Sequence, residues 1–164
     1  AYGYSGFGDI FVFIFFGFVG VLGTFLLQFQ VINRLVLQEA ILPAITMGCF
    51  SAAVLHLNNM RDCVNDKNSN KITLAIRLGK TGSKIYHSLL ILAGISSLYV
   101  FGNQIYFSAY DYLWLSIPFL LLLKHLFFVL KNNDPKALDP ELKKVALMTF
   151  TTSLILLTLL IQSY

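Results

Sequence analysis

Long apolar runs dominate the pattern of hydrophobic and polar positions along the chain. Five of them approach the length of about 20 residues that a helix needs to cross a bilayer core of about 30 Å. They run over about 10–27, 40–57, 85–101, 112–130 and 145–161. Because lipid offers the backbone no hydrogen-bond partners, each run is predicted to be a helix. The predicted fold class is therefore all-α integral membrane, with five transmembrane helices.

The composition agrees with a membrane protein. Hydrophobic residues make up 57% of the 164 residues and charged residues only 12%, about half of the roughly 25% that is usual in soluble domains. Two cysteines, Cys49 and Cys63, are too few for a disulfide framework and are interpreted as structural thiols. The chain begins with neither Met nor the basic region of a signal peptide, so we expect it to start inside a longer protein.

The polar segments between the apolar runs alternate in charge. Segments 59–84 and 131–144 are rich in Lys and Arg, whereas 28–39 holds only Arg34 and 102–111 holds none. The positive-inside rule predicts that both basic segments and the N-terminal edge face the cytoplasm and that the C-terminus lies outside. Since no base-stacking or groove-reading pattern accompanies the basic residues, a nucleic-acid partner is not expected.

The first apolar run combines small and aromatic residues. Gly17, Gly20 and Gly23 stand three apart, and small residues let membrane helices approach closely. Tight helix packing is the favoured interpretation, with a gap for a lipid tail as the alternative. The run also contains aromatic rings that suit either packing or the shelter of a cation, namely Phe11, Phe13, Phe15, Phe16 and Phe18.

Candidate chemistry lies directly after the second apolar run. Asn58, Asp62 and Asp66 are four residues apart, so a helix places them along one face. Two carboxylates and an amide oxygen are hard ligands of the kind that Mg²⁺ prefers. Arg61 and Lys71 stand close by and can neutralise phosphate oxygens. The spacing alone fits equally a solvated segment with ion pairs, so it leaves both interpretations open.

The flanking residues carry a resemblance to a known family. The run Asn58-Asn59-Met60-Arg61-Asp62, then Asp66, then Asn70-Lys71-Ile72-Thr73-Leu74-Ala75-Ile76-Arg77-Leu78-Gly79 resembles the second aspartate-rich motif of the UbiA-type intramembrane aromatic prenyltransferases. Within that superfamily it looks most like the 1,4-dihydroxy-2-naphthoate polyprenyltransferases. Tyr2-Gly3-Tyr4-Ser5-Gly6-Phe7-Gly8-Asp9 is similar to the start of the family's fifth helix.

The resemblance covers essentially the whole chain. It implies that residues 1–164 are the C-terminal part of a single prenyltransferase membrane domain, corresponding to helices five to nine of a nine-helix bundle. Residues 58–84 would be its cytoplasmic aspartate-rich motif and loop. The family's first aspartate-rich motif lies in an N-terminal half that this chain lacks. We therefore expect half a site here, and a chain that is inactive alone.

The resemblance also implies a role for each matching residue. Metal ligands are expected in Asn58, Asp62 and Asp66, which would hold Mg²⁺ against polyprenyl diphosphate. Substrate-binding residues are expected in Asn59, Arg61, Lys71 and Arg77, with diphosphate oxygens as partners of the three cations. Tyr4 and Asp9 would lie near the aromatic acceptor or the leaving group. The residues expected to be catalytic are Asp62, Asp66 and Asp9.

The implied reaction is magnesium-assisted loss of diphosphate followed by attack of the naphthoate ring on the prenyl carbon. Carbon dioxide is lost and demethylmenaquinone forms, at the cytoplasmic side of the cell membrane. One departure from the family is Asn70, where a Gly is usual. Asn is the next best residue for a left-handed turn, so the turn is predicted to survive.

Other interpretations stay open at this point. The acceptor could instead be 4-hydroxybenzoate or haem, or the chain could be a non-catalytic transporter module. A transporter should carry charges near the middle of the bilayer, whereas the acidic residues here gather at one end. His56 is interpreted as a core or interfacial residue, His87 as interfacial, and Lys124 as a side chain that snorkels to the membrane surface.

Overall fold

The computed structural model describes residues 6–28 and 34–163 of the chain, and within these ranges it contains helices and no strand. The predicted all-α class is confirmed. The elements in chain order are α1 (Gly8–Val12), η2 (Phe13–Gly23), α2 (Thr24–Leu26), α3 (Arg34–Arg61), α4 (Cys63–Asn68), α5 (Leu74–Gln104), α6 (Ala109–Lys131), η3 (Pro135–Leu138) and α7 (Asp139–Ser163). Of the two η elements, η2 is a π-helix and η3 a 3₁₀-helix.

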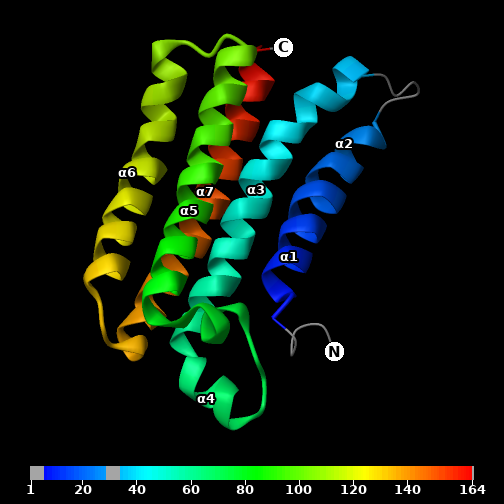
Figure 1. Ribbon diagram of the computed structural model, residues 1–164. Helices are drawn as coiled ribbons and strands as arrows, with labels where there is room; N and C mark the ends of the chain where they lie inside the picture. Colours follow the sequence, from blue (N-terminus) through cyan, green and yellow to red (C-terminus); the bar gives the residue numbers. More distant parts are fainter. Residues whose placement is uncertain (1–5, 29–33, 164) are drawn as a thin grey trace.

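Five helical stretches are long and apolar enough to cross a membrane: Gly8–Leu26, Ala40–Arg61, Leu74–Gln104, Ala109–Lys131 and Pro135–Gln162. Each contains most of one predicted run, so the five predicted spans are confirmed. Figure 1 shows them side by side as one bundle, with α4 at the end where α1 begins and the C-terminus at the opposite end. This arrangement agrees with the odd number of crossings expected from the alternating charge.

Helix α3 lies at the centre of the bundle, packed against η2, α5 and α7. Its buried residues Phe50, Ala53 and Leu57 form a core with apolar side chains of α5, α6 and α7. A Cβ atom at Gly94 would lie 2.4 Å from a ring carbon of Phe50. The missing side chain of Gly94 therefore leaves α5 a notch for this ring, which fixes how α3 and α5 fit together.

The first span touches α3 through glycine. A Cβ atom at Gly17 would lie 2.6 Å from the Ala44 carbonyl oxygen, and one at Gly48 would lie 2.8 Å from the Phe13 carbonyl oxygen. At Gly20 and Gly23 the nearest atoms belong to η2 itself. The tight packing predicted for the glycine series is thus made by Gly17. The opposite side of the span is exposed and includes Phe15 and Phe16.

Segment 59–84 contains more helix than predicted. It was expected to be a loop, but α3 continues to Arg61, α4 follows, and α5 begins at Leu74 rather than near Ile85. Backbone hydrogen bonds do not require apolar side chains, so a helix can extend beyond its apolar part. The hydropathy pattern therefore marks the apolar part of a helix and not its first residue. Gly79, with φ 66° and ψ −177°, breaks α5 near its start.

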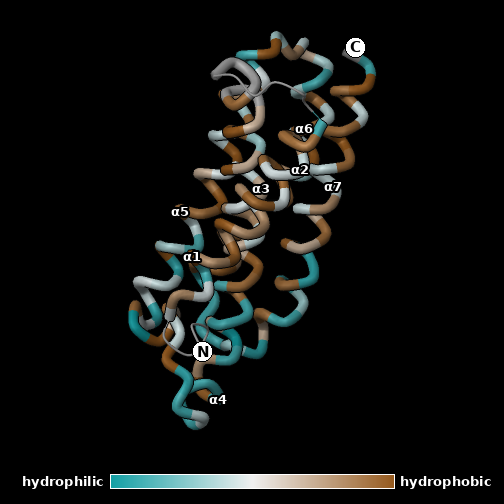
Figure 2. Tube along the Cα trace, turned by 90° about the vertical axis from the view of Figure 1, so that its right-hand side faces the viewer, coloured by the Kyte–Doolittle hydropathy of each residue, from teal (hydrophilic) through white to brown (hydrophobic). Residues whose placement is uncertain are grey.

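Two turns agree with local sequence signals. Asn70 has φ 55°, so the predicted left-handed turn is confirmed at the position where the family usually has Gly. Helix α6 begins with a capping box in which Ser108 and Asp111 bond each other's backbone. Figure 2 shows that hydrophilic residues gather at the α4 end of the bundle while hydrophobic residues dominate its length. This polar end holds the chemistry predicted from the sequence.

Candidate active site

The predicted metal-binding face crosses the junction of α3 and α4. Although α3 ends at Arg61, the Asp62 backbone N–H donates to the Asn58 carbonyl at 3.0 Å and the Asp66 N–H donates to the Asp62 carbonyl at 2.9 Å. The four-residue hydrogen-bond spacing is therefore kept on both sides of Asp62, although the φ and ψ of this residue, −91° and 8°, depart from helical values. Asn58, Asp62 and Asp66 consequently follow one another along one side of the chain, as the spacing predicted.

Arg61 stands among these oxygens. Its guanidinium donates to Asn58 Oδ1 at 2.7 Å and to both carboxylate oxygens of Asp62 at 2.8 and 2.9 Å. A fourth hydrogen bond of 2.7 Å reaches Asp139 Oδ1 in the first turn of α7. The planar guanidinium is suited to such a two-pronged contact with a carboxylate. Two of the three expected metal ligands are thus held by one cation.

Asp66 has its own cation. Lys71 Nζ donates to both carboxylate oxygens of Asp66, at 3.1 and 3.0 Å. The left-handed turn at Asn70 reverses the chain direction and brings Lys71 back beside Asp66. The Lys71 N–H accordingly also donates to the Asp66 carbonyl at 2.9 Å. We use the name rim cluster for this group of five residues: Asn58, Arg61, Asp62, Asp66 and Lys71.

The rim cluster is electrostatically balanced. Hydrogen bonds from Arg61 hold the pKa of the Asp62 carboxyl below its usual range, so this group is ionised at neutral pH. Beside it, burial raises the pKa of the Cys63 thiol. A thiol that stays protonated is a poor nucleophile and a poor metal ligand. This agrees with the structural role predicted for Cys63 and leaves the carboxylates as the reactive anions.

Asp9 and Asn59 lie apart from the rim cluster, inside the bundle. Asp9 is only 1% exposed. Its Oδ2 accepts a hydrogen bond of 2.7 Å from His56 Nδ1, and its Oδ1 accepts one of 3.3 Å from Asn59 Nδ2. The structure therefore brings Asp9 together with Asn59 but not with Asp62 and Asp66. Tyr4, the other residue expected near the acceptor, lies outside the described residues.

Arg77 meets the N-terminal segment. A Cβ atom at Gly6 would lie 3.1 Å from Arg77 Nε and 3.2 Å from the Ile72 carbonyl oxygen, and Gly6 has φ +79°. Only glycine adopts this backbone angle readily while leaving room for a neighbouring side chain. Gly6, which belongs to the stretch that resembles the start of the family's fifth helix, thus packs against the tail of the central motif, far from it in the sequence.

The structure adds five buried residues that the sequence reasoning did not join. His87 Nε2 lies 2.8 Å from His125 Nε2, and His125 Nδ1 lies 2.7 Å from Glu141 Oε2. His87 was predicted to be interfacial, but it is fully buried between helices. The name histidine row denotes Asp9, His56, His87, His125 and Glu141. The available signal was one histidine in each of three apolar spans, since ionisable residues inside a membrane protein need partners.

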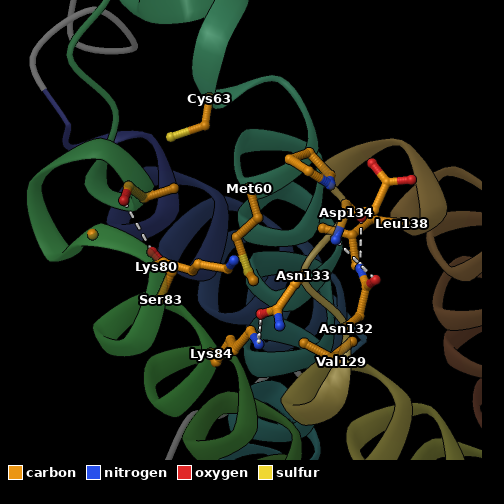
Figure 3. Close-up of a pocket in the computed structure, with 13 residues that line it drawn as sticks. Met60, Cys63, Lys80, Ser83, Lys84, Val129, Asn132, Asn133, Asp134 and Leu138 are labelled. Atoms are coloured by element: carbon orange, nitrogen blue, oxygen red, sulfur yellow. Dashed lines mark hydrogen bonds between the residues drawn. The ribbon is translucent and has the colours of Figure 1, made fainter.

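A pocket of about 230 Å³ lies between the end of α3, the start of α5 and the connection from α6 to η3, and is shown in Figure 3. Met60, half a turn from both Asn58 and Asp62, belongs to its lining. Lys84 Nζ donates to the Leu130 carbonyl at 2.9 Å and to Asn133 Oδ1 at 3.4 Å. These contacts tie α5 to the end of α6. The lining of the pocket includes none of the five residues of the rim cluster.

The donor set of the rim cluster suits a hard cation. The described residues contain no group of three or more His, Cys, Asp or Glu side chains placed to hold a metal ion. Asn58, Asp62 and Asp66 offer an amide oxygen and two carboxylates, and Mg²⁺ commonly takes only one or two carboxylates together with water and phosphate oxygens. These protein oxygens now accept hydrogen bonds from Arg61 and Lys71, which a cation would have to replace.

Comparison with known proteins gives a consistent result. The model of the UbiA prenyltransferase family matches residues 2–148. Similar proteins include the 1,4-dihydroxy-2-naphthoate octaprenyltransferases of Haemophilus influenzae, 38% identical, and Escherichia coli, 35% identical, each over 94% of this chain and 48% of the relative. That of Mycobacterium tuberculosis is 43% identical over 57% of this chain and 31% of its own length.

The match therefore extends over most of this chain but only part of its relatives. The chain spans about half the length of the curated relatives it matches. No solved structure matches it significantly. The family model covers most of the chain, including the rim cluster and all of the histidine row, and two relatives exceed 30% identity over nearly its full length. The chain belongs to the UbiA prenyltransferase family.

Proposed function

We propose that this chain is the C-terminal half of an enzyme that transfers a polyprenyl group from polyprenyl diphosphate to 1,4-dihydroxy-2-naphthoate. Carbon dioxide is lost in the reaction and demethylmenaquinone is the product. The observation that carries the proposal is the rim cluster, in which three oxygen ligands and two cations meet at one end of a membrane bundle. The acceptor is inferred from the names of the relatives in Haemophilus influenzae and Escherichia coli.

In this proposal Asn58, Asp62 and Asp66 hold Mg²⁺. The fit rests on the chemistry of the donors, which are hard oxygens along one side of the chain. When bound, Mg²⁺ supplies the positive charge that favours departure of diphosphate. The low pKa of Asp62 keeps its carboxylate ready for a cation at neutral pH. Asp66 lies one helical turn further along and completes the face.

In this proposal Arg61 and Lys71 pair first with carboxylates and then with the phosphate oxygens of the substrate. Without substrate they neutralise Asp62 and Asp66. With polyprenyl diphosphate bound, they turn to its phosphate oxygens, because a metal ion then compensates the carboxylates. Cations held close to the leaving group stabilise the negative charge that develops there. Arg61 is suited to this exchange, since its side chain is 26% exposed and its partner Asp139 is 56% exposed.

The second half of the site is assigned to the N-terminal half of the same protein. The first span supports this assignment, because large apolar side chains along it are exposed, including Ile14, Phe15, Phe16 and Val19. Such a face needs a cover of lipid or protein. Further ligands for the metal and a wall for the prenyl tail would come from that half. The 164-residue chain alone is therefore expected to be inactive.

The site is placed on the cytoplasmic side of the cell membrane. The support for this is the charge distribution, since α4 contains Lys67 and the first turns of α5 contain Lys80 and Lys84. Excess Lys and Arg in short membrane-flanking segments marks the cytoplasmic side. The polyprenyl chain is apolar and lies in the membrane, whereas the naphthoate is polar and reaches the site from water. A site at the membrane rim is accessible to both substrates.

The test uses the full-length protein purified in detergent with polyprenyl diphosphate and Mg²⁺. Three acceptors are offered separately: 1,4-dihydroxy-2-naphthoate, 4-hydroxybenzoate and haem. We expect a prenylated, decarboxylated product from the naphthoate alone, identified by mass spectrometry. A product from another acceptor only would reassign the substrate, and no product from any would contradict the proposal. Residues 1–164 alone serve as the matched control, and robust turnover by them would overturn the assignment of half a site.

A further inference from the structure

The pocket shown in Figure 3 has no part in the proposed function. It lies between the end of α3, the start of α5 and the connection from α6 to η3, with a volume of about 230 Å³. Much of its lining is apolar and includes Met60, Val129 and Leu138. Two lysines of α5, Lys80 and Lys84, also line it. A mostly apolar pocket with a few charged groups is typical of a ligand site, and these charges are positive.

Lys80 is a cation without a protein anion beside it. Its ammonium takes part in none of the ion pairs found among the described residues. Gly79, directly before it, interrupts α5 with φ 66° and ψ −177°, a backbone angle that glycine adopts readily. Figure 3 shows the Lys80 side chain extending from α5 toward Met60. The ammonium is therefore directed across the pocket with its charge available to a ligand.

Lys84 is fixed in place and still has a hydrogen to donate. Its Nζ donates to the Leu130 carbonyl at 2.9 Å and to Asn133 Oδ1 at 3.4 Å, and an ammonium carries three hydrogens. The second contact orients the Asn133 amide, because the oxygen must face the lysine. The amide NH₂ group of Asn133 then points elsewhere and can donate as well. The pocket thus offers three donors: Lys80 Nζ, Lys84 Nζ and Asn133 Nδ2.

The acidic side chain nearest to these donors does not cancel their charge. Asp134 alone is acidic among the lining residues. Its Oδ1 accepts a hydrogen bond of 3.0 Å from the Lys136 backbone N–H, and Figure 3 shows its carboxylate directed away from Lys80 and Lys84. The pocket is therefore positive on the side of α5. Lysine ammonium groups commonly bind phosphate oxygens, so a phosphate group fits this side.

The pocket also borders the surface that faces lipid. Ile85, the residue after Lys84, and Leu130, whose carbonyl accepts from Lys84, are both exposed. Phe127 is exposed one turn earlier on α6, and Lys131 Nζ lies 4.0 Å from the centre of its ring. Long cationic side chains lie in this way along apolar surface where it meets water. Basic pockets between membrane helices at this level bind the headgroups of anionic lipids.

We propose that this pocket binds the phosphate group of an anionic phospholipid, with Lys80, Lys84 and Asn133 as its donors. The apolar part of the lining then packs against the glycerol and the start of the acyl chains. A free phosphate ion offers the same oxygens but nothing for the apolar lining, so the lipid is the assigned ligand. A zwitterionic lipid carries a second, positive group beside its phosphate, which the two lysines repel. The site does not depend on the proposed function.

A bound headgroup would hold three separate segments together. It would contact Met60 at the end of α3, the two lysines of α5 and Asn133 in the connection from α6 to η3. A ligand that binds only the folded state stabilises that state in proportion to its occupancy. Anionic lipid should therefore raise the unfolding temperature of the protein, and the rise should saturate once the pocket is filled.

The test follows thermal unfolding of the full-length protein in a neutral detergent. Three additives are titrated separately: phosphatidylglycerol, phosphatidylcholine and, without lipid, inorganic phosphate against chloride at equal ionic strength. We expect a saturable rise of the midpoint with phosphatidylglycerol alone. An equal rise with phosphatidylcholine would overturn the requirement for a negative headgroup. An equal rise with inorganic phosphate would overturn the assignment to a lipid, and no rise with any additive would overturn the site.

Lys80→Met tests the pocket itself, and it removes no ion pair found among the described residues. We expect the apparent affinity for phosphatidylglycerol to fall about fivefold, the loss expected for one lysine at an anionic lipid surface. Lys80→Arg keeps the charge and should stay within about twofold of the unmodified protein. The matched control is Lys143→Met on an exposed position of α7 outside the pocket, which should also stay within about twofold. Equal losses in the two Met variants would indicate diffuse attraction and overturn the pocket.

Native mass spectrometry gives a second measurement, because it counts the lipids that remain bound when detergent is removed. We expect one phosphatidylglycerol more on the unmodified protein than on Lys80→Met, and equal numbers would overturn the site. Should Lys80→Met fail to fold, Asn133→Ala takes its place, since it removes an exposed amide donor and leaves both lysines. It should lower the apparent affinity at least twofold, and an unchanged affinity would overturn the assigned donors.

Discussion

The rim cluster and the histidine row both pair carboxylates with nitrogen-bearing side chains and both include residues near the end of α3, yet they differ in exposure. In the rim cluster the side chains of Arg61 and Asp62 are 26% and 30% exposed. In the row those of His56 and Asp9 are 0% and 1% exposed. A partly solvated ion pair can exchange partners at low cost, whereas removing one partner from a buried pair strands the other.

This difference in exposure distinguishes a ligand-binding role from a structural role, which the residue types alone do not distinguish. The rim cluster can release its oxygens to a ligand and recover its own hydrogen bonds afterwards. The histidine row keeps its partners and fixes the helices relative to one another. Substitutions in the rim cluster should therefore affect activity more than stability, and those in the row should affect stability as well as activity.

The largest effect is expected for Asp62→Asn and Asp66→Asn in the full-length protein. Each should lower prenyl transfer at least a thousandfold, about 4 kcal/mol in transition-state stabilisation, because the neutral amide lacks the negative charge with which the carboxylate holds Mg²⁺. Membrane insertion should be unchanged. Turnover is measured as prenylated naphthoate, with Asp134→Asn in the loop before η3 as the control. Wild-type turnover by either rim variant would remove the metal assignment.

The next effect concerns stability. His125→Leu leaves Glu141 and His87 without their buried partner, and we expect the free energy of unfolding to fall by about 3 kcal/mol. Asp139→Asn breaks only an exposed pair with Arg61 and should cost under about 1 kcal/mol. Both are measured by denaturant titration of helicity in detergent. Equal losses would contradict the separation of roles.

A smaller effect is expected from Lys71→Met. Its ammonium forms an ion pair with Asp66 and is proposed to bind diphosphate, so the variant should lower kcat/KM for polyprenyl diphosphate about tenfold, about 1.4 kcal/mol, with little loss of stability. Lys67→Met, a change of the same kind in the neighbouring turn, is the control and should stay within twofold. A Lys71→Met variant with full activity would show that this lysine serves only Asp66.

The smallest effect is a dependence of stability on pH. Arg61 lowers the pKa of Asp62 in the folded state, so the unfolded chain binds this proton more tightly. The stabilisation is present above the unfolded pKa of about 4 and is lost as the pH falls through the lower, folded pKa. Because the pair is partly exposed, it contributes under about 1 kcal/mol. The stability difference between the wild type and Asp62→Asn should accordingly shrink below pH 4; an undiminished difference would contradict the contribution of ionised Asp62.

The spans and the alignment of Asn58, Asp62 and Asp66 were predictable from local pattern. Apolar runs locate the five helices because the bilayer selects for length and hydropathy, and four-residue spacing is enough to align Asn58 with Asp62. The left-handed turn at Asn70 followed from residue type. These features depend on neighbours in the sequence. The early start of α5 at Leu74 was missed because a polar helix gives no hydropathy signal.

The pairings between distant residues were not predictable in this way. Asp9 with His56, His87 with His125, and Arg61 with Asp139 each join different spans. Which side of a membrane helix faces which neighbour depends on its rotation, and helices rich in apolar residues all round show little preferred face. One histidine in each of three apolar spans was the available signal, but their partners emerged only from the packed bundle.

The contact between Gly17 and Gly48 determines how far the first span lies from α3. The two backbones touch there without side chains between them, while Asp9 stands eight residues away, about 12 Å along the helix. A methyl group added at Gly17 would push the first span away from α3 at this contact and displace the end of the span that carries Asp9. The hydrogen bond between Asp9 and His56 therefore depends on the missing side chain of Gly17 as well as on the charge of Asp9.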